Sequence, residues 1–232
     1  MTSILIPLFE GVELMDFTAP HEFFSLAPDL QLIVASRGGK PIDVHGLTFS
    51  NLADLDAVER CDVICIPGGV GVIGAIEDDG FMSSIRRLAG SARYLTSVCT
   101  GSLILGAAGL LTGRRAACHW SCRHILAEFG AIPDAGRVVR DGNVITGGGI
   151  TAGADFALIL IAEICGEDVA QRVQLTAEYA PAPPFNSGTP EEAPPHILAA
   201  VNDRLAGMVA EHHERLRNYV SRSRQGTAPL AR

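Results

Sequence analysis

Cys99 occupies the position in this sequence best suited to nucleophilic chemistry. A β-prone run ends at Val98, and Thr100 and Gly101 lead into a segment rich in Leu and Ile. This pattern predicts a strand, a tight turn and a helix, the arrangement called a nucleophile elbow. A helix N-terminus favours a thiolate, so we expect the Cys99 pKa to lie below its usual value of about 8.5. The alternative is a small buried side chain of the core.

Asp16 is the second candidate for chemistry because it is a single carboxylate among apolar residues. It lies between Met15 and Phe17, shortly after the first expected strand. Apolar surroundings remove water from a carboxylate and raise its pKa, which suits it to exchanging protons near neutral pH. The alternative role is a helix cap. The other candidate elements at the same edge of the sheet favour the catalytic role.

A glycine-rich turn at residues 66–71 is the third candidate. Ligands bind at the carboxyl ends of strands in open α/β sheets, so this turn and Cys99 should share one edge. Backbone N–H groups around Gly69 and Val70 could then position a substrate, an oxyanion or water. The alternative is a turn with a structural role alone. The Thr100 hydroxyl either binds a substrate atom or caps the helix that follows.

Other motifs do not form a consistent metal or cofactor site. Residues 118–124 contain two cysteines and two histidines, but structural zinc sites usually draw on two separated ligand pairs. We therefore interpret His119 and His124 as hydrogen-bonded structural residues and expect no metal. The turn at 66–71 lacks the Gly-Lys-Ser/Thr of a phosphate loop, and residues 147–153 lack the context of a dinucleotide site. No cofactor is expected.

Short apolar runs that alternate with helical patterns predict an α/β fold with a mainly parallel sheet flanked by helices. Strands are expected over residues 3–9, 30–36, 62–66 and 93–98, and helices over 20–27, 151–165 and 167–179. Hairpins are expected at 40–50 and at 137–146, where Asp-Gly marks the second turn.

The C-terminal part differs in composition. Residues 180–195 contain six prolines, which predicts an extended surface segment. Apolar residues then recur at intervals of four or seven up to about residue 222, as in an amphipathic helix. We divide the chain into an α/β domain over 1–195 and a C-terminal helix and tail over 196–232. The helix is expected to pack on the same domain or on a partner subunit.

Charge and hydropathy narrow the location and the partners. The 232 residues carry a net charge of −8 with no basic block, which argues against nucleic acid and anionic membranes as partners. The N-terminus lacks the features of a secretory signal, and no apolar run approaches the roughly 18 residues that span a bilayer. We therefore expect a cytoplasmic protein with six free thiols that acts on a small molecule.

Several segments together resemble the DJ-1/PfpI superfamily. They are residues 15–20, 62–69, 97–101, 108–111, 119–120, 140–143, 146–153 and 178–185. Within that superfamily the chain is most similar to the isocyanide hydratase (isonitrile hydratase) family. The resemblance implies a cofactor-free homodimer with a flavodoxin-like core, related to the class I glutamine amidotransferases. It also implies a hydro-lyase that adds water to an isocyanide to give an N-substituted formamide.

Two positions separate this chain from other members of the superfamily. Many relatives, including glyoxalase-like ones, carry a glutamate near the cysteine, whereas isocyanide hydratases resemble this chain in having an aspartate at the position of Asp16. Protease-like members place a histidine where this chain has Thr100. Related regulators append a DNA-binding domain, for which the residues after Pro195 are too few.

The resemblance implies a covalent mechanism. The Cys99 thiolate would attack the isocyanide carbon while Asp16 supplies a proton, giving a thioimidate that water then hydrolyses with Asp16 as the base. Two alternatives stay open. One is a glyoxalase- or deglycase-like enzyme that uses the same cysteine, and the other is a redox-responsive protein in which Cys99 is oxidised.

Overall fold

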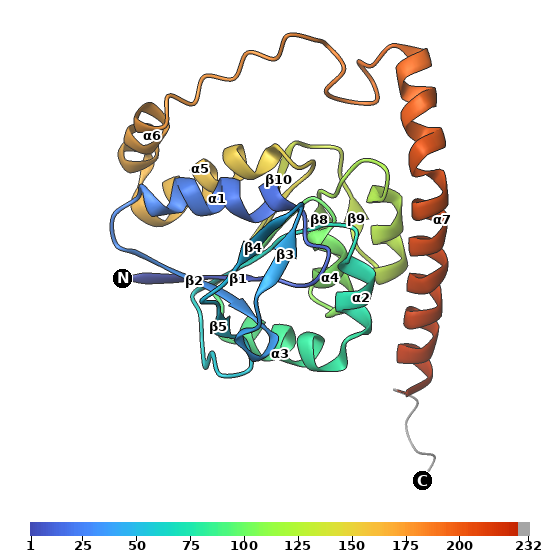
Figure 1. The fold of residues 1–232 in the computed structure, drawn as a ribbon, viewed down its shortest axis with the longest axis horizontal. Coiled ribbons are helices and arrows are strands. Elements are labelled where there is room, and N and C mark those ends of the chain that lie inside the picture. Colours follow the sequence, from blue (N-terminus) through green and yellow to red (C-terminus); the bar gives the residue numbers. More distant parts are fainter. Residues whose placement is uncertain (227–232) are drawn as a thin grey trace.

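A seven-stranded sheet forms the centre of the fold (Figure 1). The computed structural model describes the backbone of residues 1–226 and the side chains of residues 1–222. The strand order is β10-β11-β7-β6-β1-β2-β5, and every pair is parallel except β10 with β11. The expected α/β class is confirmed. The strands are β1 (Thr2–Pro7), β2 (Leu30–Ser36), β5 (Ala53–Asp54), β6 (Val63–Ile66), β7 (Tyr94–Val98), β10 (Val138–Asp141) and β11 (Val144–Gly147).

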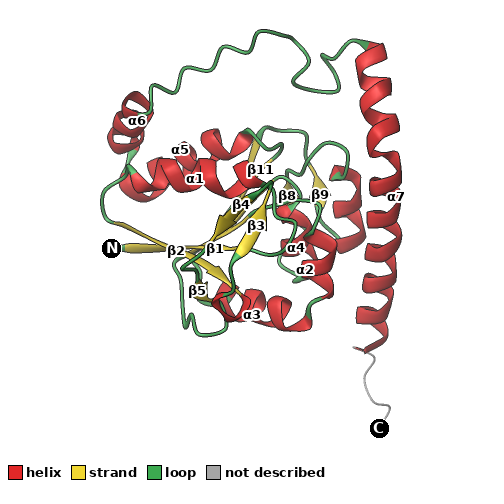
Figure 2. Ribbon diagram, viewed as in Figure 1, coloured by secondary structure: helices red, strands yellow, loops and turns green. Residues whose placement is uncertain are grey.

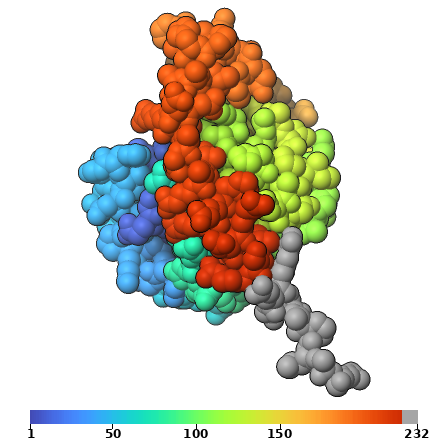
Figure 3. Space-filling view, turned by 90° about the vertical axis from the view of Figure 1, so that its right-hand side faces the viewer, coloured from blue at the N-terminus to red at the C-terminus, as the bar shows by residue number. Residues whose placement is uncertain are grey.

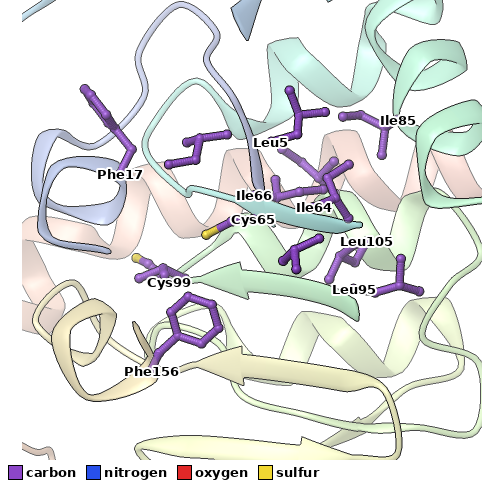
Figure 4. Close-up of a cluster of buried hydrophobic side chains, with 14 of the residues drawn as sticks. Leu5, Phe17, Ile64, Cys65, Ile66, Ile85, Leu95, Cys99, Leu105 and Phe156 are labelled. Atoms are coloured by element: carbon purple, nitrogen blue, oxygen red, sulfur yellow. The ribbon is translucent and has the colours of Figure 1, made fainter. Parts of the chain in front are cut away.

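Helices cover the sheet, which explains why β6 and β7 are buried along their whole length. Helix α5 packs on α1 and against β11 and β7, while α4 packs on β6 and β7 and contacts α2. Figure 4 shows Phe156, Ile85 and Leu105 of three different helices in one buried cluster with the strand residues. The helices of the domain are α1 (Leu14–Ser25), α2 (Val72–Glu77), α3 (Asp79–Ala89), α4 (Gly101–Ala107), α5 (Ala152–Cys165) and α6 (Glu167–Thr176).

The strand order reverses next to β1, and this places two loops together. After β1 the chain adds β2 on one side, and it later returns to place β6 on the other. In open parallel sheets such a reversal leaves a crevice at the carboxyl ends of the strands. Here the loops after β1 and β6 meet, because the Glu13 N–H donates to the Gly68 carbonyl at 2.8 Å and the Gly71 N–H to Gly11 at 3.0 Å.

The first helix is longer than the sequence predicts. Helix α1 begins at Leu14 rather than at Pro20, and Pro20 lies inside it. Proline is common in the first turn of a helix, and for that reason the sequence predicted a start at Pro20, six residues too late. Glu13 occupies the N-cap position, so Asp16 lies in the first turn of the helix instead of capping it.

Both expected hairpins are confirmed. Strands β3 (Ile42–Val44) and β4 (Leu47–Phe49) pair in antiparallel fashion, as do β10 and β11 around the turn at Gly142. Several elements were not expected, among them α2, α3, β5 and the small elements that follow α4. Strands β8 (Arg115–Ala116) and β9 (Ile132–Pro133) form a short parallel pair, and residues Arg123–Phe129 form a 3-10 helix between them.

The proline-rich segment is extended and mostly exposed, as expected, and it leads into the long helix α7 (Pro195–Gly226). Figure 2 shows the segment as a loop between α6 and α7, and Figure 3 shows α7 lying across one face of the molecule. Only the second half of α7 packs closely on the domain, with Leu216 fully buried. Ile197 and Val201 in its first half are 41% and 37% exposed. The tail expected over 227–232 lies outside the described residues.

None of the described helices combines the length and apolar character needed to cross a membrane.

Candidate active site

Cys99 lies in a strained turn between β7 and α4. Its φ of 56° falls in the left-handed region that residues with a side chain rarely adopt. The Cys99 N–H donates to the Gly147 carbonyl at 3.0 Å. At Gly101 a Cβ atom would collide with the Ile66 carbonyl oxygen, so only glycine allows α4 to begin this close to β6. The expected nucleophile elbow is confirmed.

Asp16 is fully buried in the first turn of α1. Its Oδ2 accepts a hydrogen bond of 2.8 Å from the Gly68 N–H, while Oδ1 has no well-formed partner among the described residues. Burial raises the Asp16 pKa from 3.8 to about 7, opposed by the Gly68 hydrogen bond and assisted by the charge of Glu13. The carboxyl group is therefore able to release and regain a proton near neutral pH, as the sequence predicted.

The pKa of Cys99 differs from the expectation. Cys99 is only 5% exposed, and burial raises its pKa well above the usual value, assisted by electrostatic interaction with Asp16 and with the neighbouring thiol of Cys118. The Thr100 N–H favours the thiolate but does not outweigh the loss of water. The predicted lowering was wrong because α4 is only seven residues long and desolvation is the larger effect.

Asp16 and Cys99 act as one titrating pair. Their side chains interact directly, and this interaction favours the neutral thiol and the charged carboxylate. Two negative charges next to each other in a buried site are unfavourable, so the pair keeps at least one proton at neutral pH. The first of its two protons leaves near pH 7, where Asp16 titrates.

The glycine turn holds Asp16 and Thr100 together. The Gly69 N–H donates to Thr100 Oγ1 at 3.0 Å, and the same hydroxyl lies 3.4 Å from the Gly69 carbonyl oxygen. Thr100 makes no side-chain cap for α4, so the capping role is wrong. A Cβ atom at Gly68 would lie 2.5 Å from Thr100 N and 2.9 Å from Asp16 Oδ2. Nothing larger than glycine fits there.

The turn offers fewer free donors than the sequence suggested. The Gly69 N–H is already used by Thr100. The Val70 N–H donates no hydrogen bond within residues 1–222, and the Val70 side chain is 68% exposed. The Val70 N–H is thus the backbone donor of the turn that remains available to a ligand.

Two thiols near the pair were not identified as site residues from the sequence. Cys118 is buried beside Cys99 and interacts with Ser102, and Cys65 of β6 lies near enough to Asp16 to feel its charge. Figure 4 shows Cys65 and Cys99 in the same buried cluster. The apolar neighbours of Cys65 in the sequence indicated only a core position, and Cys118 was considered only within the metal-like cluster of residues 118–124. Burial raises the pKa of both thiols to about 12, so they stay neutral.

The histidines of residues 118–124 have structural contacts. His119 Nδ1 lies 2.8 Å from Ser121 Oγ, and the ring of His124 packs edge-on against that of His213 with centroids 5.4 Å apart. No group of three or more His, Cys, Asp or Glu side chains in the part of the chain that the structure describes could hold a metal ion.

Comparison with known proteins identifies relatives of this chain in sequence and in fold. The chain is 48% identical over 200 residues to the isonitrile hydratase of Pseudomonas putida, a match that covers 86% of this chain and 88% of that protein. A ThiJ/PfpI family protein from Pseudomonas syringae has a similar structure, with a TM-score of 0.88, 38% identity, and coverage of 94% of this chain and 90% of that one. DJ-1beta of Drosophila melanogaster shares the fold at a TM-score of 0.69 and 24% identity, over 78% of this chain and 99% of that one. The sequence model of the DJ-1/PfpI family matches residues 2–163, and the chain belongs to that family.

Proposed function

We propose that this protein is an isocyanide hydratase, a hydro-lyase that converts an isocyanide and water into an N-substituted formamide. The observation that carries the proposal is the buried pair of Cys99 and Asp16, in which a nucleophile adjoins a carboxyl group that titrates at about 7. The 48% identity to the isonitrile hydratase of Pseudomonas putida supports the same reaction.

In the first half of the cycle the singly protonated pair adds to the isocyanide. Its reactive form has the proton on Asp16 and the charge on Cys99. Cys99 Sγ attacks the terminal carbon of the isocyanide, and Asp16 delivers its proton to the same carbon. The product is a thioimidate bound to Cys99, with Asp16 left as a carboxylate.

In the second half water hydrolyses the thioimidate. The Asp16 carboxylate takes a proton from water as the water oxygen bonds to the carbon, and Asp16 then passes this proton to the substrate nitrogen. The Asp16 carboxylate then takes the proton of the hydroxyl group of the tetrahedral adduct as the C–S bond breaks and the Cys99 thiolate leaves. The hydrogen on the formamide carbon is the one that Asp16 delivered in the first half. One hydrogen of water ends on the nitrogen and the other replaces the proton of the Cys99–Asp16 pair, so the cycle balances.

The glycine turn has two roles in this proposal. The Gly68 N–H holds the Asp16 carboxyl group, and Gly69 holds Thr100, the residue after Cys99, through their mutual hydrogen bonds. The Val70 N–H positions the adduct or the attacking water, because it is the available donor of the turn. All groups in the cycle belong to the protein or the substrate, and the proposal requires no cofactor or metal.

We also propose that the protein acts as a cytoplasmic homodimer. Its C-terminal arm, residues 180–204, is mostly exposed and carries apolar side chains that its own domain leaves uncovered. Phe185 is 79% exposed, and Ile197 and Val201 continue the apolar stripe of α7 away from the domain. A second copy covering the arm would bury these side chains.

The test offers the purified protein an aryl isocyanide and methylglyoxal in separate reactions. We expect formamide from the first and no lactate from the second, with activity abolished in Cys99→Ala and nearly abolished in Asp16→Asn. Lactate without formamide would instead favour the glyoxalase-like alternative. The redox alternative requires that neither product forms while Cys99 oxidises, but its raised pKa makes it a poor target for oxidants.

A further inference from the structure

His212 is a buried titratable residue of α7 that the proposed mechanism does not use. It is 5% exposed, and its Nδ1 is buried without a hydrogen-bond partner among the described residues. Its imidazole ring interacts with the backbone of Val70. Burial lowers the pKa of the ring, so it is neutral at physiological pH.

Helix α7 also contacts the other end of the segment that begins at Val70. Arg215 Nη2 lies 2.6 Å from Glu77 Oε2, at the last residue of α2. Leu216, in the same turn of α7, is fully buried in the core. In Figure 1 the α7 ribbon runs beside α2, in agreement with their contacts. The segment 70–77 is thus attached to α7 at its first and last residues.

The start of this segment is the glycine turn of the active site. Gly68, two residues before Val70, donates the hydrogen bond to Asp16 Oδ2, and Gly69 donates to Thr100. The turn has little freedom of its own, since a Cβ atom at Gly69 would collide with the Gly11 carbonyl oxygen. A displacement of the Val70 backbone therefore reaches the donor that orients the carboxyl group.

We propose that His212 is a positioning residue that fixes the Val70 backbone and, through the glycine turn, sets the Asp16 carboxyl group against Cys99. The kinetic part of this inference rests on the proposed function, whereas the effect on the Cys99–Asp16 pair does not. The C-terminal helix is then a part of the active site that lies more than a hundred residues from it in the sequence.

The experiment compares three substitutions of His212 with one control. His212→Leu removes the hydrogen-bonding group, while His212→Gln and His212→Asn place an amide near the positions of Nε2 and Nδ1. His213→Gln is the matched control, because the neighbouring histidine faces Glu128 at 3.2 Å instead of the turn. Thermal unfolding confirms that each variant is folded.

The first readout needs no isocyanide. The rate at which iodoacetamide alkylates Cys99, followed by peptide mass spectrometry, should rise through an inflection near pH 7, where the pair loses its first proton. The Gly68 hydrogen bond lowers the Asp16 pKa, so loosening the turn moves this inflection to higher pH. We expect that movement in His212→Leu, and no movement in the control or in the amide variant that reaches Val70.

The second readout is steady-state hydration of an aryl isocyanide. His212→Leu should lower kcat by about tenfold or more with KM within about twofold, because misplacement of a catalytic group slows chemistry more than binding. One of the two amide variants should restore kcat. If the His212→Leu variant does not fold, the test is the difference in kcat between the His212→Gln and His212→Asn variants.

Two results would overturn the inference. One is a His212→Leu variant with the natural inflection and kcat, and the other is an equal loss in the Leu, Gln and Asn variants. Failure of the proposed function would be distinguishable, because the unsubstituted protein would then form no formamide. The alkylation profiles of the unsubstituted protein and of the His212 variants would still test the role of His212.

Discussion

Replacing Asp16 by asparagine removes a carboxyl group whose charged form is disfavoured by burial more than its hydrogen bonds favour it. In the folded protein the Asp16 pKa is about 7, against a usual value of 3.8. The folded state therefore holds a proton that the unfolded state has released between these two values. The sign follows from linkage: the contribution of this group to stability is fully present below pH 3.8 and is lost as the pH rises through 7.

The magnitude follows from the two pKa values. The difference between 3.8 and about 7 corresponds to about 4 kcal/mol. Asparagine does not ionise, so its variant does not lose this free energy. Its side-chain oxygen can accept the Gly68 hydrogen bond, but its NH2 group would occupy the place of the unpartnered Oδ1, at a cost of about 1–3 kcal/mol that does not depend on pH.

The assay is urea unfolding of both proteins at several pH values from 4 to 8. The difference in free energy of unfolding between Asp16→Asn and the natural chain should grow by several kcal/mol in favour of the variant as the pH rises. Titration of the other carboxylates is common to both chains and cancels in this difference. If the free energies of unfolding of the two proteins changed in parallel with pH, Asp16 would not hold a proton in the folded state at neutral pH.

Asp62→Asn provides a control of opposite sign. Asp62 Oδ2 accepts hydrogen bonds of 2.8 Å from the N–H and from the hydroxyl of Ser3, which lower its pKa. The stabilising contribution of Asp62 is present above the pKa of the unfolded chain and is lost as the pH falls through the lower pKa of the folded one. The Asn variant should therefore be less stable than the natural chain at neutral pH, with the deficit shrinking in acid.

Four further outcomes follow from the same geometry. The value of kcat/KM for an isocyanide should rise with pH through about 7, as the pair that contains Asp16 loses its first proton; a flat profile from pH 6 to 8 contradicts this. Gly68→Ala should lower kcat and destabilise the fold by about 1–3 kcal/mol in urea unfolding, because its Cβ would lie 2.5 Å from Thr100 N. Thr100→Ser should keep most of the activity and Thr100→Val should lose it, since only the hydroxyl accepts the Gly69 N–H; equal rates would show that this bond is dispensable. Val201→Ser should weaken the proposed homodimer, measured by sedimentation against protein concentration, and an unchanged dissociation constant removes the arm from the interface.

Local patterns were sufficient to predict the elements that carry Cys99. The strand, the turn and the start of α4 are contiguous in the sequence, so apolar spacing and small residues identify them. The same reasoning failed at α1, because its start depends on the loop after β1 meeting the turn after β6. That contact, from Glu13 to Gly68, joins residues more than fifty positions apart. The preference of proline for the first turn of a helix, applied to Pro20, carries no information about that long-range contact.

The residues of the site were easier to predict than their protonation. Asp16 stands among apolar neighbours in the sequence itself, so the direction of its pKa was correct. Cys99 is buried by residues distant in the sequence, including Cys118 and the end of β11. The sequence therefore predicted the shift of the Cys99 pKa with the wrong sign. The sequence did not indicate a role for His212 either, because the contacts of a histidine in an amphipathic helix depend on how that helix packs on the rest of the protein.

The raised pKa of Cys99 suits an addition reaction better than the lowered one would. An isocyanide carbon must receive both a nucleophile and a proton, so a site with a free thiolate beside an ionised carboxylate would supply the first without the second. Burial keeps one proton on the Cys99–Asp16 pair up to high pH, where it can be passed to the carbon as the sulfur attacks. The same burial makes Cys99 a slow target for oxidants in the absence of substrate. The pair is therefore arranged for hydration, and a fast reaction of Cys99 with hydrogen peroxide at pH 7 would contradict this argument.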